Sequence, residues 1–123
     1  MIVGIGTDIV QVARIISVLE RQGRAFAERV LCGSELAIFD RKKQQAAYLA
    51  KRFAAKEAAS KALGTGIGKV SWQDMEITNN GNGAPLLNLS GAAARRLSDL
   101  GGSQALISLS DEKDYVVAFV VLS

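Results

Sequence analysis

The strongest structural signal in the chain lies in residues 44–63, which read Gln-Gln-Ala-Ala-Tyr-Leu-Ala-Lys-Arg-Phe-Ala-Ala-Lys-Glu-Ala-Ala-Ser-Lys-Ala-Leu. Alanine and straight-chain residues, which favour helix, dominate this stretch, and Gly64 follows it as a helix stop. At ~100° per residue the apolar side chains cover almost the whole circumference, so we predict a central, mostly buried helix. Glu57 lies about 40° from Phe53, on the flank of this apolar surface, where a carboxylate requires a partner.

The N-terminal segment, residues 2–10, is rich in β-branched residues separated by short ones, which is typical of a buried strand. Successive side chains of a strand point to opposite faces, so Gly4, Gly6 and Asp8 share one face. Two glycines beside an aspartate leave space for another group to approach the backbone closely.

Shorter elements fill the rest of the chain. Apolar spacing predicts helices over residues 12–20, 25–31 and 34–39, the last with Ser34 as its N-cap. The second half predicts strands over 74–78 and 85–89 around a turn at 79–83, a helix over 90–100 capped by Ser90, and strands over 105–110 and 115–122. We therefore predict the α+β class: one small domain, residues 1–123, with helices packed on an antiparallel sheet.

The composition excludes several classes of mechanism and location. The chain contains no histidine and one cysteine, which excludes an imidazole base, a Ser-His-Asp triad, His-bound zinc and an internal disulfide. No signal-peptide pattern is present at the N-terminus, and we expect a cytoplasmic protein. The longest apolar run, 116–122, is shorter than the ~20 residues of a membrane helix, so we expect no membrane partner.

The net charge of +3 is unevenly distributed. Residues 14–69 contain 12 Lys and Arg against 5 Asp and Glu, whereas residues 70–123 contain 3 against 6. The basic part, including a strip of Arg14, Arg21 and Arg24 on or just beyond the first predicted helix, is either a solvated surface or faces an anionic partner. That partner is a nucleic acid, a phosphorylated small molecule or an acidic protein, and the scattered aromatic residues offer no platform for stacking bases.

The carboxylates of Asp8 and Glu57 are both expected in apolar surroundings. Such a pair suits Mg²⁺, which takes one or two carboxylates, retains water and completes its shell with substrate phosphates. Lys61 follows Glu57 by one turn and either neutralises a phosphate or forms an i,i+4 ion pair with Glu57. The residues alone leave both a metal site and a structural role open.

Residues 64–69, Gly-Thr-Gly-Ile-Gly-Lys, superficially match a phosphate loop. They are not a Walker A motif, because only three residues separate Gly64 from Gly68, Val70 replaces the Ser or Thr, and a helix precedes them. Two interpretations remain: a glycine helix stop followed by a flexible turn, or backbone N–H groups that face a phosphate.

Residues 6–14, Gly-Thr-Asp-Ile-Val-Gln-Val-Ala-Arg, and 52–67, Arg-Phe-Ala-Ala-Lys-Glu-Ala-Ala-Ser-Lys-Ala-Leu-Gly-Thr-Gly-Ile, closely resemble bacterial holo-acyl-carrier-protein synthases, a family of 4'-phosphopantetheinyl transferases. The order of segments agrees over nearly the full length. The resemblance implies a Mg²⁺-dependent enzyme that transfers 4'-phosphopantetheine from coenzyme A to a serine of apo-acyl carrier protein. The products would be holo-acyl carrier protein, used in fatty acid biosynthesis, and adenosine 3',5'-bisphosphate.

The resemblance also implies roles for individual residues. Asp8 and Glu57 match the metal ligands of the family. Together with Lys61, they also match its catalytic residues. Coenzyme A would lie near Arg52, Lys56, Lys61, Gly64, Thr65 and Gly66. The acidic carrier protein would dock on Arg14, Arg21 and Arg24. The family forms homotrimers with active sites between neighbouring subunits, which suits a chain too small to build a deep cleft alone.

One departure from the family concerns the general base. Many relatives carry a histidine where Asp111 follows Ser110 here. The proton of the carrier serine would then pass to Asp111, to Glu57 or to a metal-bound water, and we favour the water because an ordinary aspartate is a weak base. The alternative to an enzyme is a small basic RNA-binding module, whose affinity would fall steeply with salt and require neither metal nor coenzyme A.

Overall fold

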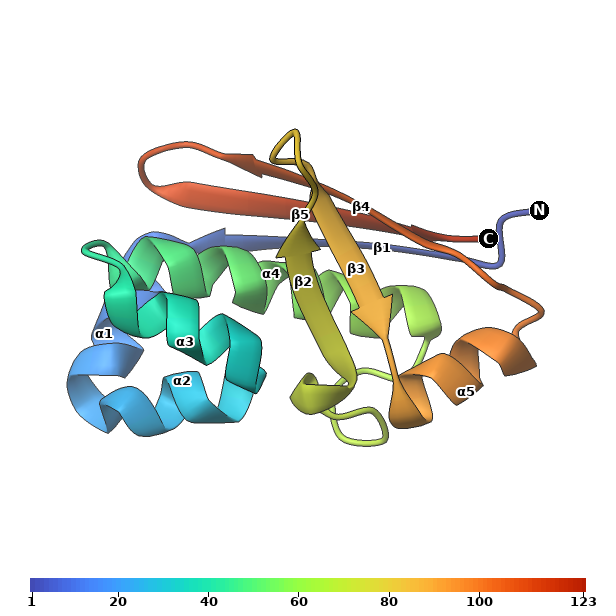
Figure 1. The fold of residues 1–123 in the computed structure, drawn as a ribbon, viewed down its shortest axis with the longest axis horizontal. Helices are drawn as coiled ribbons and strands as arrows, with labels where there is room; N and C mark the ends of the chain where they lie inside the picture. The colour runs from blue at the N-terminus through green and yellow to red at the C-terminus, as the bar shows by residue number, and fades with distance from the viewer.

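The computed structural model describes all residues, 1–123. Its larger sheet is antiparallel with the order β1 (Gly4–Gln11), β5 (Tyr115–Leu122), β4 (Ala105–Asp111), so the two ends of the chain lie side by side in one sheet (Figure 1). The hairpin of β2 (Met75–Asn79) and β3 (Pro85–Leu89) forms a second, separate sheet. The α+β class is confirmed, but the antiparallel strands form two sheets instead of one.

Helix α4 (Gln45–Leu63) lies along β1 and β5, and twelve of its nineteen residues are buried. This confirms the central helix. A Cβ atom added at Gly6 would come within 2.6 Å of the Ala62 backbone nitrogen and still closer to the Ala58 carbonyl oxygen, and one at Gly4 would collide with the Ala62 carbonyl oxygen. The group that approaches the two glycines is therefore α4 itself.

The remaining helices cover the two ends of α4 (Figure 1). Helices α1 (Val12–Gln22), α2 (Arg24–Val30) and α3 (Gly33–Arg41) surround its N-terminal half. The short helix η1 (Trp72–Asp74) and α5 (Gly91–Asp99) lie nearer its C-terminal end. None of these helices combines the length and the apolar composition needed to cross a membrane.

Two predicted helix caps differ from the structure. Cys32, not Ser34, is the N-cap of α3, and its backbone N–H donates to the Glu35 carboxylate at 2.8 Å. Ser90 occupies the N-cap position of α5, but its hydroxyl donates to the Asp74 carbonyl (3.3 Å) instead of capping the helix. At α3 the capping contact stays within the first turn, between Cys32 and Glu35, whereas at α5 a contact with another element replaces the local side-chain cap.

Candidate active site

Asp8 of β1, Glu57 of α4 and Lys61 of α4 form one cluster. The Lys61 ammonium donates to the Asp8 carboxylate at 2.9 Å and to the Thr7 carbonyl at 3.1 Å. The i,i+4 ion pair between Lys61 and Glu57 is not formed, because Lys61 instead bridges the helix and the strand. The close packing of the glycine face of β1 on α4 brings these three side chains together.

The electrostatics of Glu57 favour a bound cation. Burial raises the pKa of the Glu57 carboxyl, the negative charge of Asp8 raises it further, and Lys61 lowers it. One ammonium thus faces two carboxylates, and the cluster is left with an excess of negative charge when both are ionised.

The chemistry of these donors fits Mg²⁺. The structure holds no group of three or more His, Cys, Asp and Glu side chains that could bind a metal ion. Asp8 and Glu57 would offer only two hard oxygen ligands, so water and a substrate phosphate would have to complete the shell, as is common where proteins bind Mg²⁺.

Residues 64–66 form the C-terminal cap of α4. This favours the interpretation of the segment as a glycine helix stop over that of a loop whose N–H groups face a phosphate. Gly64 is left-handed (φ 75°), and the backbone N–H groups of Gly64, Thr65 and Gly66 all donate to the carbonyls of Ser60 and Lys61. These donors are consequently used inside the protein and do not face a ligand. An anion that binds here would therefore not be held by these three N–H groups.

Lys56 has a structural position that the sequence does not reveal. It is fully buried, and its ammonium donates to the Glu35 carboxylate (2.7 Å) and to the Val30 and Trp72 carbonyls (2.7 and 3.2 Å). The expectation that Lys56 lies near the coenzyme A phosphates is corrected, since every side of its ammonium is covered by protein. Glu35 gave no signal in the sequence beyond its capping-box spacing from Cys32.

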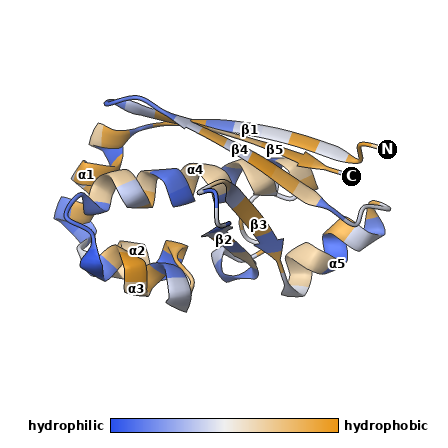
Figure 2. Cartoon of the chain, turned by 45° about the horizontal axis from the view of Figure 1, so that its top comes forward, coloured by the Kyte–Doolittle hydropathy of each residue, from blue (hydrophilic) through white to orange (hydrophobic).

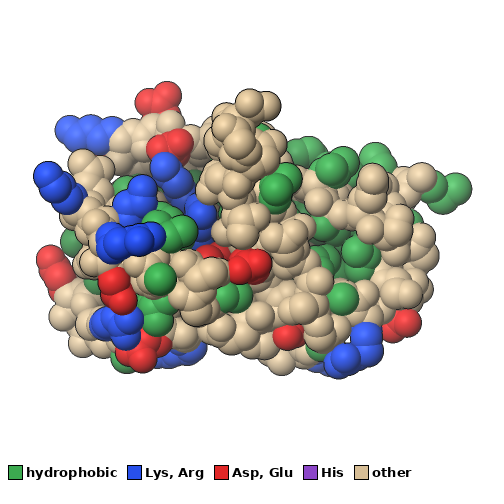
Figure 3. All heavy atoms as spheres, in the orientation of Figure 1, with side chains coloured by type: hydrophobic (Ala, Val, Ile, Leu, Met, Phe, Trp, Pro, Cys, Tyr) green, Lys and Arg blue, Asp and Glu red, His purple; other side chains and the backbone are tan.

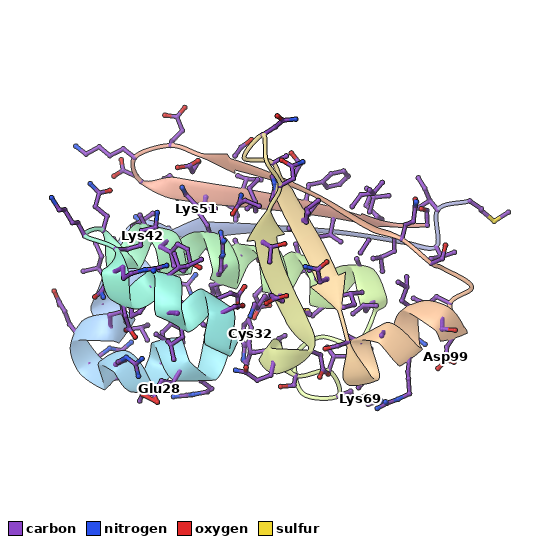
Figure 4. The ribbon with its side chains drawn as sticks, viewed as in Figure 1. Glu28, Cys32, Lys42, Lys51, Lys69 and Asp99 are labelled. Carbon is purple, nitrogen blue, oxygen red and sulfur yellow. The ribbon has the colours of Figure 1, made fainter.

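Arg52 lies largely inside the protein but reaches a surface pocket. Only 6% of the residue is exposed, its guanidinium stacks on the Tyr48 ring at 4.5 Å, and Nε is buried without a hydrogen-bond partner. The pocket, of about 480 Å³, is lined by Arg52 together with Ile38, Lys42, Tyr48, Lys51, Asn79, Gly83, Pro85, Leu109 and Asp111. Lys42 and Lys51 project from the same end of the molecule (Figure 4), where basic side chains gather on the surface (Figure 3).

The three arginines of the predicted docking strip are all exposed, but they differ in charge pairing. Arg14 and Arg21 form no ion pair. Arg24 binds Asp40 through two hydrogen bonds of 3.0 and 2.7 Å, which hold the pKa of that carboxyl below its usual value, and it also lies 3.4 Å from Glu28. The unpaired positive charge of the strip is therefore that of Arg14 and Arg21.

Asp111 lies apart from the carboxylate cluster. It ends β4, and β5 separates β4 from β1, so two strand spacings lie between Asp111 and the strand of Asp8. Its carboxylate lies 3.5 Å from the Lys51 ammonium. The structure does not bring Asp111 and Asp8 together within one chain.

The chain is similar to known proteins over nearly its full length. The sequence model of the 4'-phosphopantetheinyl transferase superfamily matches residues 4–120. The holo-[acyl-carrier-protein] synthase of Shewanella loihica is 55% identical over 99% of this chain and 98% of its own length. The crystal structure of the corresponding synthase from Neisseria meningitidis is 47% identical, superimposes with a TM-score of 0.93, and is matched over 100% of this chain and 99% of that one.

A further solved structure includes a ligand. It is a holo-(acyl-carrier-protein) synthase from Bacillus anthracis in complex with CoA (3',5'-ADP), 41% identical, with a TM-score of 0.84 over 99% of this chain and 96% of that chain. The chain belongs to the 4'-phosphopantetheinyl transferase superfamily. The expectation of an enzyme of the holo-[acyl-carrier-protein] synthase type within that superfamily is confirmed.

Proposed function

We propose that this protein transfers the 4'-phosphopantetheine group from coenzyme A to a serine of apo-acyl carrier protein, with Mg²⁺, in support of fatty acid biosynthesis. The observation that carries the proposal is the cluster of Asp8, Glu57 and Lys61 in a chain whose full-length relatives are holo-[acyl-carrier-protein] synthases. In the reaction the serine oxygen forms a bond to the phosphorus that bears the pantetheine group. The bond from that phosphorus to the bridging oxygen of the pyrophosphate breaks, adenosine 3',5'-bisphosphate leaves, and the proton of the serine hydroxyl passes to a carboxylate or to water.

The residues of the cluster have distinct tasks. Asp8 and Glu57 would hold Mg²⁺, which supplies charge stabilisation to the pyrophosphate when it is bound. Lys61 is fixed by Thr7 and Asp8, and its exposed ammonium can offset the negative charge that develops on the leaving phosphate. Because this ammonium is already positioned before substrate binds, little reorganisation is needed during the reaction.

An exposed apolar surface supports the proposal of a homotrimer. Ile5 and Ile9 of β1, Phe119 of β5 and Leu106 of β4 lie on the face of the larger sheet turned away from α4, and each is 41–63% exposed. Figure 2 shows hydrophobic residues recurring along all three strands. Apolar patches of this kind mark protein interfaces, and copies of the same chain would cover them.

A site between copies also accounts for the separation of the predicted coenzyme A contacts. Arg52 and Gly64 are twelve residues apart along α4 and just beyond it, roughly 18 Å at 1.5 Å per residue. They line different pockets. We infer that the Arg52 pocket of one copy faces the Asp8, Glu57 and Lys61 cluster of its neighbour, and this arrangement would also bring Asp111 of the first copy toward that cluster.

The test is mass spectrometry of apo-acyl carrier protein incubated with coenzyme A, Mg²⁺ and this protein. We expect the carrier to gain one phosphopantetheinyl group, with no gain when Mg²⁺ is chelated. The variants Asp8→Asn and Glu57→Gln keep the side-chain shape and remove a metal-binding charge, so each should abolish transfer while the protein stays folded. Unmodified carrier with the wild-type enzyme and Mg²⁺ would refute the proposed activity, and full activity of both variants at low Mg²⁺ would refute the metal site.

The trimer has its own test. Sedimentation equilibrium should give three times the mass of the 13.0 kDa chain, and Phe119→Lys should lower this mass, because it buries a charge in the apolar face. A fully active monomer would contradict the proposed arrangement.

A further inference from the structure

Tyr48 contacts two of the cations that line the pocket of about 480 Å³. It is buried, with 7% of the residue exposed, and belongs to the pocket lining itself. The Arg52 guanidinium lies 4.5 Å from the centre of the Tyr48 ring, and the Lys42 ammonium lies 5.8 Å from it. Both lie within the ~6 Å over which an aromatic ring attracts a cation. The Tyr48 hydroxyl donates to the Glu35 carbonyl at 3.2 Å, which fixes the orientation of the ring.

No carboxylate forms a hydrogen bond with either of these two cations. Lys42 forms no ion pair. The Nε of Arg52 lies 3.9 Å from the Glu35 carboxylate, which is beyond hydrogen-bond distance, and its Nη2 forms only two long hydrogen bonds (3.3 and 3.4 Å) to neutral oxygens. The Glu35 carboxylate instead accepts from the Lys56 ammonium (2.7 Å) and from two backbone N–H groups (2.8 and 2.9 Å). The charges of Lys42 and Arg52 therefore remain available to an anionic ligand.

The third cation of the pocket, Lys51, is held differently. Its ammonium lies 3.5 Å from the Asp111 carboxylate, which also lines the pocket. A carboxylate competes with an anionic ligand for the cation, because it carries the same charge as the ligand. An aromatic ring attracts a cation through its quadrupole and has no net charge, so it orients the cation without neutralising it. Tyr48 is thus suited to keep Lys42 and Arg52 in place for an anion.

We propose that Tyr48 is a positioning residue for coenzyme A: its ring holds Arg52 and Lys42 in the pocket lining with their charges available to the ligand. The inference rests on the proposed function, in which coenzyme A lies near Arg52, and adds a residue that acts through two others. A lysine side chain loses conformational freedom when it binds a ligand, and a ring that restricts it beforehand reduces that loss. The larger effect should pass through Arg52, whose guanidinium is nearer to the ring.

The experiment measures the dissociation constant of coenzyme A by isothermal titration calorimetry. Tyr48→Leu removes the ring and keeps a buried apolar side chain, and it should weaken binding about tenfold. Tyr48→Phe keeps the ring and should recover most of this loss. Phe39→Leu is the matched control, because Phe39 is also buried (2% exposed) and no Lys or Arg lies over its ring. If Tyr48→Leu weakens binding no more than Phe39→Leu does, the inference is wrong.

A double-mutant cycle with Arg52→Gln separates positioning from a direct contact between Tyr48 and the ligand. If Tyr48 acts mainly through Arg52, Tyr48→Leu should change the affinity by less than about threefold once Arg52 is replaced. An equal loss in both backgrounds would refute the positioning role, and so would an Arg52→Gln variant that binds coenzyme A as the wild type does. In steady-state kinetics Tyr48→Leu should raise the KM for coenzyme A and leave the KM for carrier protein unchanged, a split that general loosening of the fold would not produce.

Should Tyr48→Leu fail to fold, two side chains of nearly the same shape decide. Phenylalanine and its pentafluorinated analogue can each be introduced at residue 48, and fluorine withdraws the electron density with which the ring attracts cations. The fluorinated protein should bind coenzyme A about tenfold more weakly than Tyr48→Phe. Equal affinities of these two proteins would overturn the inference.

The two proposals fail in different ways. Wild-type protein that binds coenzyme A but does not modify apo-acyl carrier protein would refute the activity, and the titrations would still decide the role of Tyr48. Wild-type protein that modifies the carrier, while the Tyr48 variants bind coenzyme A with wild-type affinity, would refute only the positioning role.

Discussion

Replacement of Gly6 by alanine should force β1 and α4 apart. The added Cβ would lie 2.6 Å from the Ala62 backbone nitrogen, whereas ordinary contact begins at 3.4 Å, so the two elements must separate by at least 0.8 Å (3.4 − 2.6). The Ala58 carbonyl oxygen lies closer still. Because the obstructing atoms belong to a helix backbone and cannot rotate away, we expect a loss near the upper end of overpacking costs, about 3 kcal/mol.

The assay is urea unfolding followed by circular dichroism, with Gly33→Ala as the control. A Cβ at Gly33 meets no atom within 4 Å, so that variant should be as stable as the wild type or slightly more stable. Gly6→Ala should also reduce transfer by the molecules that remain folded, because Asp8 lies two residues further along the strand. An unchanged urea midpoint for Gly6→Ala would refute the claim that close packing of β1 on α4 is fixed by glycine.

Three further predictions follow from charges in and around the site. The pKa of Glu57 is raised, so its ionised form destabilises the metal-free fold. Glu57→Gln should therefore be more stable than the wild type at neutral pH without Mg²⁺. The difference in urea midpoint should vanish as the pH falls below the ordinary glutamate pKa of 4.5, where the carboxyl is protonated in both the folded and unfolded protein. Arg14→Gln should raise the KM for carrier protein more than Arg24→Gln does, because Arg24 is already paired, and steady-state kinetics that show the reverse would refute the assignment of the docking charge. Lys56→Met leaves the Glu35 carboxylate buried without the Lys56 ammonium, and the free energy of urea unfolding should fall by about 3–5 kcal/mol. The folded variant should bind coenzyme A normally. A selective loss of coenzyme A binding would show that Lys56 contacts the substrate after all.

The sequence determined the elements with strong local signals. The alanine-rich stretch could form little other than a buried helix, and Gly64 supplied the left-handed residue that ends it. The turn over 79–83 and the strand over 115–122 were also recognisable, because turn residues and β-branched runs act locally. The family resemblance rested on two contiguous motifs, which fix residue identities without any knowledge of packing.

The contact of Ser90 at the start of α5 and the number of sheets were decided by contacts between distant segments. Ser34 matches a local cap rule, yet the cap of α3 is Cys32, whose thiol also donates to the Met75 carbonyl at 3.2 Å. No periodicity indicates which strands pair, and only the register of β1 on β5 places the N-terminal strand in the C-terminal sheet.

The site shows the same division. Sequence pattern selected Asp8, Glu57 and Lys61, but it could not show that Lys61 pairs with Asp8, since that contact joins residues 53 positions apart. Lys56 and Lys61 are both lysines on one helix, and the family resemblance placed both near coenzyme A. Tertiary packing buries the first against Glu35 and leaves the second exposed, because the burial of a charge depends on which elements cover that face of the helix, and this is set by the whole fold.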